Sequence, residues 1–292
     1  MRTSSQTAEI AAAMRAAELA YPEERRMLTD RIAVRLLRDR RFKLLTLNGP
    51  LARAALKVCD RKYTGIVAEV LLRCRYADEV LRDAYDVGIR QLVVLGAGYD
   101  STAHRHRLDD GFRIYEVDHP VTQSEKRNRI AAEHLSPLTP VAYVQCDFSK
   151  DRIPDALANH PGFDPRKPTL YSWLAVTMYL DGGDVARTMR DIRHIAAPGS
   201  LLLMDYMYRE VIDGTSQHKG ALATARNVAR RGEPYVFGWQ PIEIDSALCE
   251  FGFKAREHLS VSDLANRLPD RTRFAHPVRN FMGVVLAEVD VM

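Results

Sequence analysis

The sequence predicts an α/β protein in which a mostly parallel, seven-stranded sheet carries helices on both faces and follows a helical cap. From Gln91 onward, short apolar runs alternate with helix-like segments, which is typical of parallel strands joined by helical crossovers. A glycine-rich turn follows the first of these runs. The preceding residues 5–90 show helical patterning without strand alternation. Together these observations indicate a doubly wound, Rossmann-like sheet.

Size and charge limit the classes of function. The chain has 292 residues, 46% of them hydrophobic, and a formal net charge of +4, so it can bury a full core. The small positive excess favours anionic small molecules or an acidic carrier protein over nucleic acid. No apolar stretch approaches the roughly 20 residues that cross a bilayer, and the N-terminal stretch does not resemble a secretion signal. We expect a cytoplasmic protein with a small-molecule substrate, for which an anionic or carrier-bound form is one option, and with neither nucleic acid nor membrane as partner.

The cysteines and histidines predict neither a disulfide nor a metal site. The four cysteines are widely scattered and form no C-x-x-C pair, which favours reduced thiols: Cys59, Cys74, Cys146 and Cys249. His104 and His106 flank Arg105. Two residues apart in a helix they point to different sides, and no further ligands stand at a useful spacing, so we predict no metal.

Residues 1–90 form the predicted cap. Residues 8–20 are rich in strong helix formers, and Pro22 ends that stretch. Residues 23–43 mix apolar positions with seven arginines, which predicts an amphipathic helix with a solvated basic face. The alternative is a landing surface for an anionic substrate or carrier. Residues 65–86 predict a second amphipathic helix, which contains Arg73.

Residues 91–292 form the predicted catalytic domain. The expected strands are 91–95, 113–117, 141–146, 168–174, 200–206, 253–259 and 281–289. The expected helices are 101–108, 122–134, 184–197 and 241–251. Residues 207–240 contain several glycines and resist assignment to a central element. An insertion after the fifth strand would lie above the carboxyl ends of the strands, so this segment is a candidate lid or substrate wall.

The glycine turn and the second strand predict a nucleoside site. Gly96 and Gly98 follow an apolar run that suits a strand buried on both faces. The next strand ends in two carboxylates, Glu116 and Asp118, about twenty residues beyond the glycines. In doubly wound folds this is where ribose hydroxyls are held. An adenosine-type cofactor is therefore predicted.

The sequence of the glycine turn also indicates which nucleoside cofactor is bound. The third glycine of the dinucleotide pattern G-x-G-x-x-G is absent, because Gly98 is followed by Tyr-Asp-Ser. That glycine allows close helix packing beneath a pyrophosphate. Its absence favours S-adenosyl-L-methionine over NAD or FAD. A dinucleotide and a purely structural turn remain the alternatives.

Ordered motifs are found over most of the chain, at 71–78 (LLRCRYAD), 91–100, 115–120 (YEVDHP) with Lys126, 146–148 (CDF), 178–180 (MYL), 198–200 (PGS) and 232–234 (GEP). With these motifs the chain resembles the leucine carboxyl methyltransferase family, in particular its bacterial branch of S-adenosyl-L-methionine-dependent methyltransferases. The resemblance implies the class I methyltransferase fold and S-adenosyl-L-methionine as cofactor.

The resemblance implies roles in cofactor binding for residues of the cap helix, the glycine turn and the second strand. It implies that Arg73 reaches the methionine carboxylate, which a guanidinium can hold through two parallel hydrogen bonds. The alternative is a surface arginine on the cap helix. Gly96 and Gly98 would leave room for the methionine and ribose, the alternative being tight strand-to-helix packing. Asp118 would accept hydrogen bonds from the ribose hydroxyls, with Glu116 as its competitor.

The resemblance also implies an adenine site. Asp147 would accept a hydrogen bond from the adenine amino group while the backbone of Phe148 contacts the ring. The alternative for Asp147 is the cap of a following helix. The sequence departs from the family in two places. Leu174 stands where the family has an acidic residue beside the charged methionine end, and Ser101-Thr102 replaces an arginine after the glycine turn.

The predicted activity is O-methylation of a carboxylate or hydroxyl on a small organic or polyketide-like metabolite. A carboxylate acceptor is already ionised and needs no general base, so no catalytic residue is predicted; for a phenol or amine, His218 and Tyr206 are the candidates. Tyr206, Tyr208, His218 and Tyr235 are predicted to line the substrate pocket, together with neighbouring aromatic residues. The rivals are a repurposed protein of the same fold that transfers no methyl group, motivated by Leu174, and a nicotinamide oxidoreductase.

Overall fold

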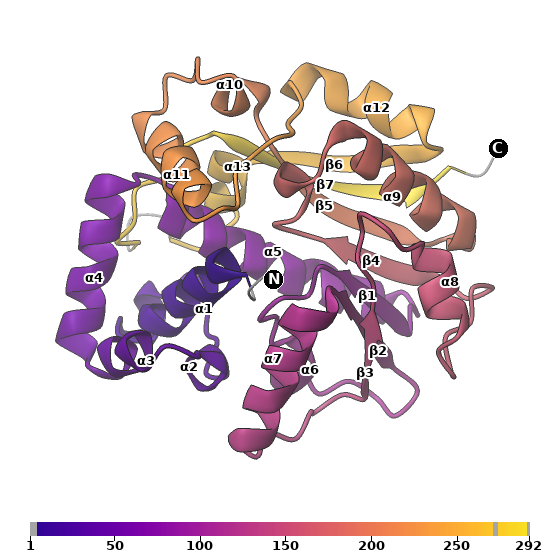
Figure 1. Ribbon diagram of the computed structural model, residues 1–292, viewed down its shortest axis with the longest axis horizontal. Coiled ribbons are helices and arrows are strands. Elements are labelled where there is room, and N and C mark those ends of the chain that lie inside the picture. The colour runs from indigo at the N-terminus through magenta and orange to yellow at the C-terminus, as the bar shows by residue number, and fades with distance from the viewer. Residues whose placement is uncertain (1–4, 271–273, 291–292) are drawn as a thin grey trace.

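A seven-stranded sheet in the order β3-β2-β1-β4-β5-β7-β6 forms the centre of the protein (Figure 1). The computed structural model describes residues 5–270 and 274–290. Strands β1 to β5 run parallel to one another, and β7 runs antiparallel to both β5 and β6. The strand bounds are β1 Gln91–Leu95, β2 Arg113–Asp118, β3 Val141–Gln145, β4 Thr169–Trp173, β5 Leu201–Met207, β6 Phe253–Ser260 and β7 Met282–Val289. The predicted fold class is confirmed, and every predicted strand lies within one residue of these bounds.

Helices cover both faces of the sheet because the strands are apolar on both. In β1, Leu92 and Val94 face the core beneath α5 (Ile66–Asp86) and α13 (Val261–Asn266), whereas Val93 and Leu95 face the opposite core. The helices that surround this second core are α8 Ile153–Ala158, α9 Gly182–Ile195 and α12 Ile244–Glu250. The first core continues into the cap, which therefore is packed against the sheet rather than linked loosely to it.

The cap contains more and shorter helices than predicted. They are α1 Gln6–Glu18, η1 Glu23–Arg25, α2 Ala33–Leu36, α3 Arg40–Leu47 and α4 Gly49–Lys62. The prediction of one helix over residues 23–43 is wrong. Asp30 accepts hydrogen bonds from the backbone N–H groups of Ile32 and Ala33, and Asp39 accepts one from Arg41. Each carboxylate thus begins a new turn of helix and interrupts the previous one.

The remaining helices surround the strand ends. They are α6 Thr102–Arg105, α7 Pro120–Ala132, α10 Arg209–Ile212, α11 Lys219–Arg230 and two short helices, η2 Thr177–Tyr179 and η3 Pro241–Glu243. The segment 207–240, which resisted assignment, contains α10 and α11. Among the described residues no helix is long and apolar enough to span a bilayer.

A buried histidine connects three distant parts of the chain. His276 Nδ1 lies 2.6 Å from Asp60 Oδ2 on α4, and its Nε2 lies 3.1 Å from Glu18 Oε2 at the end of α1. Tyr21 meets the imidazole edge-to-face. Burial alone would lower the pKa of His276, but hydrogen bonds and charge from Asp60 and Glu18 raise it to about 9. The imidazolium therefore holds the cap against the segment that precedes β7.

This cluster makes stability depend on pH. The pKa of His276 is higher in the folded than in the unfolded protein. Its contribution to the free energy of unfolding is therefore complete below about pH 6.5 and is lost as pH rises through about 9. We expect His276→Gln to lower the free energy of unfolding by about 3 kcal/mol near pH 6 and to match the wild type above pH 9. Urea unfolding across this range measures the difference. Exposed His194→Gln is the control, and a loss that is independent of pH would contradict the assignment.

Candidate functional site

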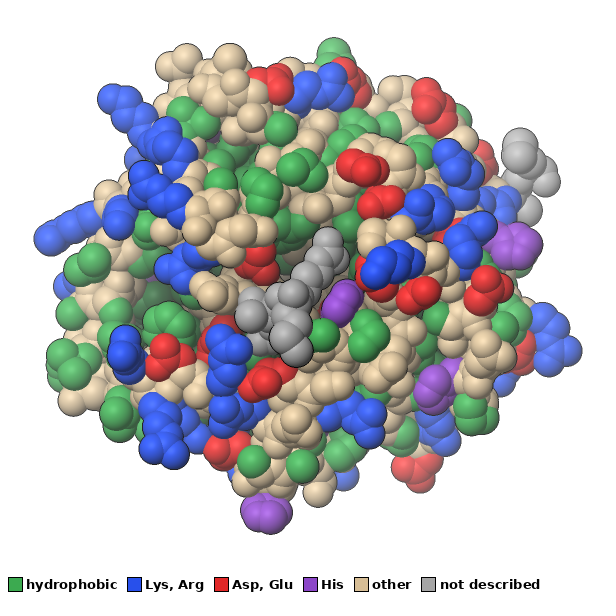
Figure 2. Space-filling model, viewed as in Figure 1, with side chains coloured by type: hydrophobic (Ala, Val, Ile, Leu, Met, Phe, Trp, Pro, Cys, Tyr) green, Lys and Arg blue, Asp and Glu red, His purple; other side chains and the backbone are tan. Residues whose placement is uncertain are grey.

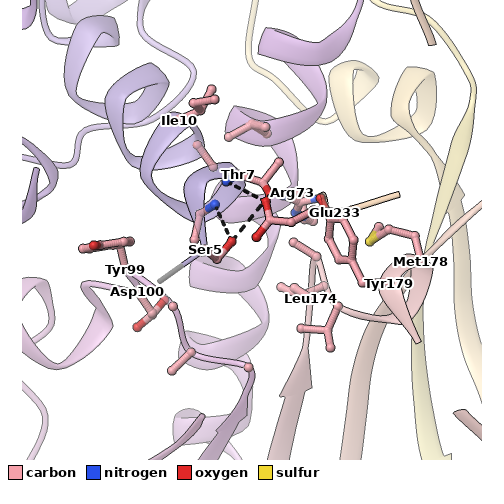
Figure 3. Close-up of a pocket in the computed structure, with 18 of the residues that line it drawn as sticks. Ser5, Thr7, Ile10, Arg73, Tyr99, Asp100, Leu174, Met178, Tyr179 and Glu233 are labelled. Carbon is pink, nitrogen blue, oxygen red and sulfur yellow. Dashed lines mark hydrogen bonds between the residues drawn. The ribbon is translucent and has the colours of Figure 1, made fainter. Parts of the chain in front are cut away.

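A cavity of about 970 Å³ lies at the carboxyl ends of β1, β2 and β4, where open α/β sheets bind ligands. Its walls come from α1, α5, the glycine turn, the segment after β4 and residues 231–236 of the insertion. In Figure 3, Arg73, Tyr179 and Glu233 stand around the same space as the turn residues Tyr99 and Asp100. The site therefore joins the cap, the sheet and the insertion.

The glycine turn needs glycine for two separate reasons. Gly96 and Gly98 both line the cavity and both have positive φ, +68° and +49°. A Cβ on Gly96 would lie 2.3 Å from Val176 Cγ2, and one on Gly98 would lie 3.2 Å from Ala8 Cβ. The backbone N–H groups of Gly96 and Ala97 both donate to the carbonyl of Val117. The turn is thus held against β2 while its other side faces the cavity.

The structure separates the two carboxylates of β2. Asp118 lines the cavity, and its two oxygens accept hydrogen bonds from the backbone N–H groups of Gly98 (2.5 Å) and His119 (2.6 Å). Glu116 is buried away from the cavity, 2.5 Å from Lys126 Nζ. Burial raises the pKa of both carboxyls, that of Glu116 to about 7. Of the two competitors, Asp118 is the one that a ligand can reach.

Asp147 and Phe148 line the cavity beyond the end of β3. Asp147 Oδ1 accepts hydrogen bonds from the backbone N–H and the hydroxyl of Ser149. Burial would raise its pKa, but these bonds and Lys150 lower it to about 2. The next helix, α8, begins at Ile153 and has Arg152 as its N-cap. Asp147 therefore closes a local turn and is not the cap of that helix.

Arg73 on α5 is buried between two carboxylates. Its Nη1 donates to Glu69 on the same helix and to Asp205 Oδ2 on β5, the latter at 2.8 Å. Arg73 and Glu69 line the cavity, whereas Asp205 lies fully buried behind them. Burial raises the pKa of Glu69 to about 7. The alternative of a surface arginine is therefore wrong.

Asp205 also organises the segment that contains Leu174. Its oxygens accept hydrogen bonds from the backbone N–H of Ala175, at 2.8 and 3.0 Å. Leu174 itself lines the cavity. Near the apolar Leu174, the structure therefore has two carboxylates: Glu69, which lines the cavity, and Asp205, which is buried behind it. Neither was predicted, although an i, i+4 acid–arginine pair and a single acid in an apolar strand were visible signals.

The N-terminal helix closes one side of the cavity. The backbone N–H and the hydroxyl of Thr7 both donate to Glu233 Oε2, the N–H at 3.1 Å (Figure 3). The rings of Tyr179 and Tyr235 meet with their centroids 5.4 Å apart. The insertion therefore contributes a wall through residues 231–236, and α1, which had no predicted role in the site, completes it.

Buried ion pairs fix α1 against the glycine turn. Arg15 on α1 donates to Asp30 Oδ2 at 2.9 Å and to the carbonyl of Tyr99 at 2.6 Å. Asp30 also accepts a hydrogen bond from Ser101, 2.7 Å away. Arg105 extends the network through two hydrogen bonds to Asp78 on α5. The cap and the turn thus share one hydrogen-bonded network.

Three of the four predicted substrate residues lie away from the cavity, which corrects the prediction. In β5, Asp205 and Met207 project to the side of the cap, whereas Tyr206 projects into the opposite core, 2.6 Å from His258 Nε2. Tyr208 and His218 do not line the cavity either; the ring of Tyr208 is tilted by 36° against that of Tyr206, and His218 precedes α11. Tyr235 does line it. For Tyr206, the alternation of a strand buried on both faces decides this outcome.

The lining of the cavity is acidic although the chain is basic. Seven carboxylates and four arginines are among its described lining residues: Glu69, Asp78, Asp100, Asp118, Asp147, Asp184 and Glu233, and Arg15, Arg73, Arg105 and Arg231. Within residues 5–270 and 274–290, no group of three or more His, Cys, Asp and Glu side chains forms a candidate metal site. Cys59, Cys74, Cys146 and Cys249 have free thiols, and Cys146 is buried.

The fold and the cavity define a Rossmann-like α/β protein with a ligand site at the ends of its parallel strands. The sequence profile of the family described as leucine carboxyl methyltransferase matches residues 8–193. The chain belongs to the leucine carboxyl methyltransferase family.

Curated relatives of this chain are provisionally named S-adenosyl-L-methionine-dependent methyltransferases. YktD of Bacillus subtilis (strain 168) is 30% identical over 66% of this chain and 64% of its own length. A protein of Mycolicibacterium paratuberculosis is 30% identical over 89% of this chain and 81% of its own. A Parafrankia relative, 32% identical, is matched over 58% of this chain and 53% of its length. The chain thus spans less than two thirds of two of these relatives.

Solved structures share the fold. A provisionally assigned methyltransferase from Thermobifida fusca superposes with a TM-score of 0.58 at 20% identity, covering 82% of this chain and 89% of its own. A DUF574 family protein from Streptomyces avermitilis also gives 0.58 at 15% identity, covering 94% and 96%. At these identities the likeness concerns the fold.

The contact between Gly96 and Val176 can be tested by substitution. We expect Gly96→Ala to lower the free energy of unfolding by at least about 2 kcal/mol, because strain at positive φ adds to a steric clash. Gly214→Ala is the matched control, since Gly214 has φ +75° but a Cβ there would meet no atom within 4 Å; it should cost about 1 kcal/mol. Adding Val176→Ala should recover part of the loss. Equal losses for Gly96→Ala and Gly214→Ala would show that the clash is absent.

Proposed function

We propose that the protein is an S-adenosyl-L-methionine-dependent methyltransferase whose cofactor lies in the cavity at the strand ends. The observation that carries this proposal is the charge of the lining, where acids outnumber arginines by three in a chain of net charge +4. A positively charged sulfonium is attracted by such a lining, whereas the pyrophosphate of NAD or FAD is repelled. The family and the names of its relatives support the same cofactor.

The residues around the glycine turn fit an adenosine group. Gly96 and Gly98 keep side chains out of the turn. Each oxygen of Asp118 accepts one backbone N–H and keeps a second lone pair for a ribose hydroxyl. In this proposal Asp147 accepts a hydrogen bond from the adenine amino group, and the backbone of Phe148 contacts the ring.

Arg73 suits the methionine carboxylate. Its Nη1 is used by Glu69 and Asp205, whereas its Nη2 makes no hydrogen bond to any described residue. Because Arg73 lines the cavity, Nη2 is available to a ligand carboxylate. Glu69 beside it offers a negative charge to the ligand's ammonium group.

The cavity has room for an acceptor beside the cofactor. Its volume lies at the upper end of the roughly 300–1,000 Å³ range of ligand pockets. Tyr235 and apolar side chains line its other walls: Ile10, Met14, Ile66, Val70 and Met207. We therefore propose an acceptor with an apolar body, a small organic or polyketide-like metabolite, methylated on a carboxylate or hydroxyl oxygen.

The contribution of the chain to the reaction is mainly positioning. When bound, S-adenosyl-L-methionine supplies the methyl group for an in-line displacement, whose rate depends on alignment of the acceptor oxygen. A carboxylate acceptor needs no proton removed. A hydroxyl acceptor would need a base to take its proton. Tyr206 and His218, considered for this role from sequence, lie outside the cavity.

A second candidate function is cofactor or metabolite binding without methyl transfer. It is favoured by Leu174, which places an apolar side chain at the methionine end of the proposed cofactor site. Incubation of acceptors with methyl-labelled cofactor separates the two. A labelled product supports the transferase, and tight cofactor binding without transfer to hydroxyl or carboxyl acceptors supports the second candidate.

Calorimetric titration with S-adenosylhomocysteine tests the cofactor site. We expect micromolar or tighter binding and no heat with NADH. Asp118→Ala should weaken binding about a hundredfold, because it removes two hydrogen bonds to a charged acceptor. Exposed Asp110→Ala is the matched control. Unchanged affinity in Asp118→Ala would remove the ribose role from this residue, and no binding to the wild type at millimolar ligand would refute the proposal.

Arg73→Lys separates charge from geometry at the methionine end. Lysine keeps the positive charge between Glu69 and Asp205 but lacks the second N–H direction of a guanidinium. We expect about tenfold weaker S-adenosylhomocysteine binding, while adenosine, which has no carboxylate, binds as before. Arg75→Lys on the same helix, outside the cavity, is the control. Equal effects of Arg73→Lys on both ligands would contradict the carboxylate contact.

A further inference from the structure

The outer face of α3 and α4 combines exposed leucines with unpaired basic residues. Four large apolar side chains are exposed there: Leu44 (70%), Leu47 (65%), Leu51 (56%) and Val58 (60%). Leu44 and Leu47 are three residues apart on α3, and Leu51 and Val58 are seven apart on α4, so each pair shares a helix face. We call residues 38–62 the amphipathic edge. Figure 2 shows hydrophobic and basic side chains together along this side of the molecule.

The charge of the amphipathic edge is strongly positive. Residues 38–62 contain eight Lys and Arg but only two acids, Asp39 and Asp60. Asp39 caps α3 and Asp60 is bound to His276, so both are used inside the protein. Four exposed basic residues form no ion pair with any described residue: Arg40, Arg41, Lys57 and Arg61. Elsewhere on the amphipathic edge, Arg38 pairs with Glu9 and Lys43 with Glu133, so the excess positive charge comes from these four residues and their neighbours.

We propose that the amphipathic edge binds the surface of an anionic lipid membrane. Helices with leucines beside lysine and arginine lie in the lipid interface, where the apolar groups enter the headgroup layer and the cations meet lipid phosphates. The two helices lie on the outside of the molecule in Figure 1, and a fluid surface can accommodate their exposed side chains without a complementary cleft. A second copy of this chain would bring two positive surfaces together, which disfavours it.

This inference revises the expectation of no membrane partner, which depended on the lack of a spanning segment. Surface binding needs no such segment. The same helices line the cavity through Phe42 and Cys59, and Tyr63, which follows α4, lines it too. Docking would therefore bring the cavity close to the lipid interface. The inference does not depend on the proposed methyl transfer and can fail separately from it.

Vesicle co-sedimentation of the full chain tests the proposal. The probes are vesicles of phosphatidylcholine alone and of phosphatidylcholine with about one third phosphatidylglycerol. We expect binding to the anionic vesicles only, and a loss of at least about tenfold on raising the salt from low to high. Two variants should each weaken binding about tenfold or more: Leu44→Glu/Leu51→Glu and Arg40→Gln/Arg41→Gln/Lys57→Gln/Arg61→Gln.

Matched controls remove equal apolar or basic side chains from exposed positions elsewhere. They are Val87→Glu/Ile242→Glu and Arg107→Gln/Arg166→Gln/Lys167→Gln/Lys254→Gln. Circular dichroism checks folding, and the charge variant keeps the test valid where the leucine variant unfolds. Binding that is absent, equal on neutral vesicles, or equally reduced by the controls overturns the proposal. So does binding to polyglutamate-coated beads without binding to vesicles, which would indicate an acidic protein, or self-association through this face in ultracentrifugation.

Discussion

The buried pair of Arg15 and Asp30 is the interaction on which the site depends. Removing both ions from water costs free energy that the pair alone does not recover. The remaining donors and acceptors are therefore decisive: Asp30 also binds Ser101 and two backbone N–H groups, and Arg15 also binds the carbonyl of Tyr99. The contacts with Ser101 and Tyr99 join the cap to the glycine turn, whereas the two backbone N–H groups, of Ile32 and Ala33, lie within the cap. The network thus positions α1, which forms a wall of the cavity, relative to the strand ends.

Strand-level features were predictable because burial leaves a strong pattern. Parallel strands covered on both faces are continuous apolar runs, and a turn that follows one at Gly96 marks the ligand end of the sheet. It was harder to predict from the sequence which face of the sheet each strand residue occupies. Tyr206 is one residue from Asp205, and this single step places it in the opposite core. Aromatic composition suggested a pocket wall, but the register of β5 decides which residues can form one.

Charge pairing could be predicted only where it is local. Glu69 lies four residues before Arg73 on one helix, a spacing that indicates contact. Asp205 meets the same guanidinium from a strand 132 residues away, and only the packing of α5 on the sheet brings them together. The single helix expected over residues 23–43 failed for a related reason. Helix propensity favoured one continuous helix. Asp30 and Asp39, however, accept hydrogen bonds from nearby backbone N–H groups, and a new helix begins after each of them.

The opposite charges of the cavity and the outer surface are compatible because they act over short distances. At physiological ionic strength, interactions between exposed charges decay over about 8 Å. The arginines of α3 and α4 therefore do not cancel the carboxylates around the cavity, which are partly buried and screened less. Asp118 and Glu69 contribute to the charge inside the cavity, whereas Arg40 and Arg61 contribute to that of the outer surface. A net charge of +4 describes neither surface, and sequence-level charge alone cannot indicate what either one binds.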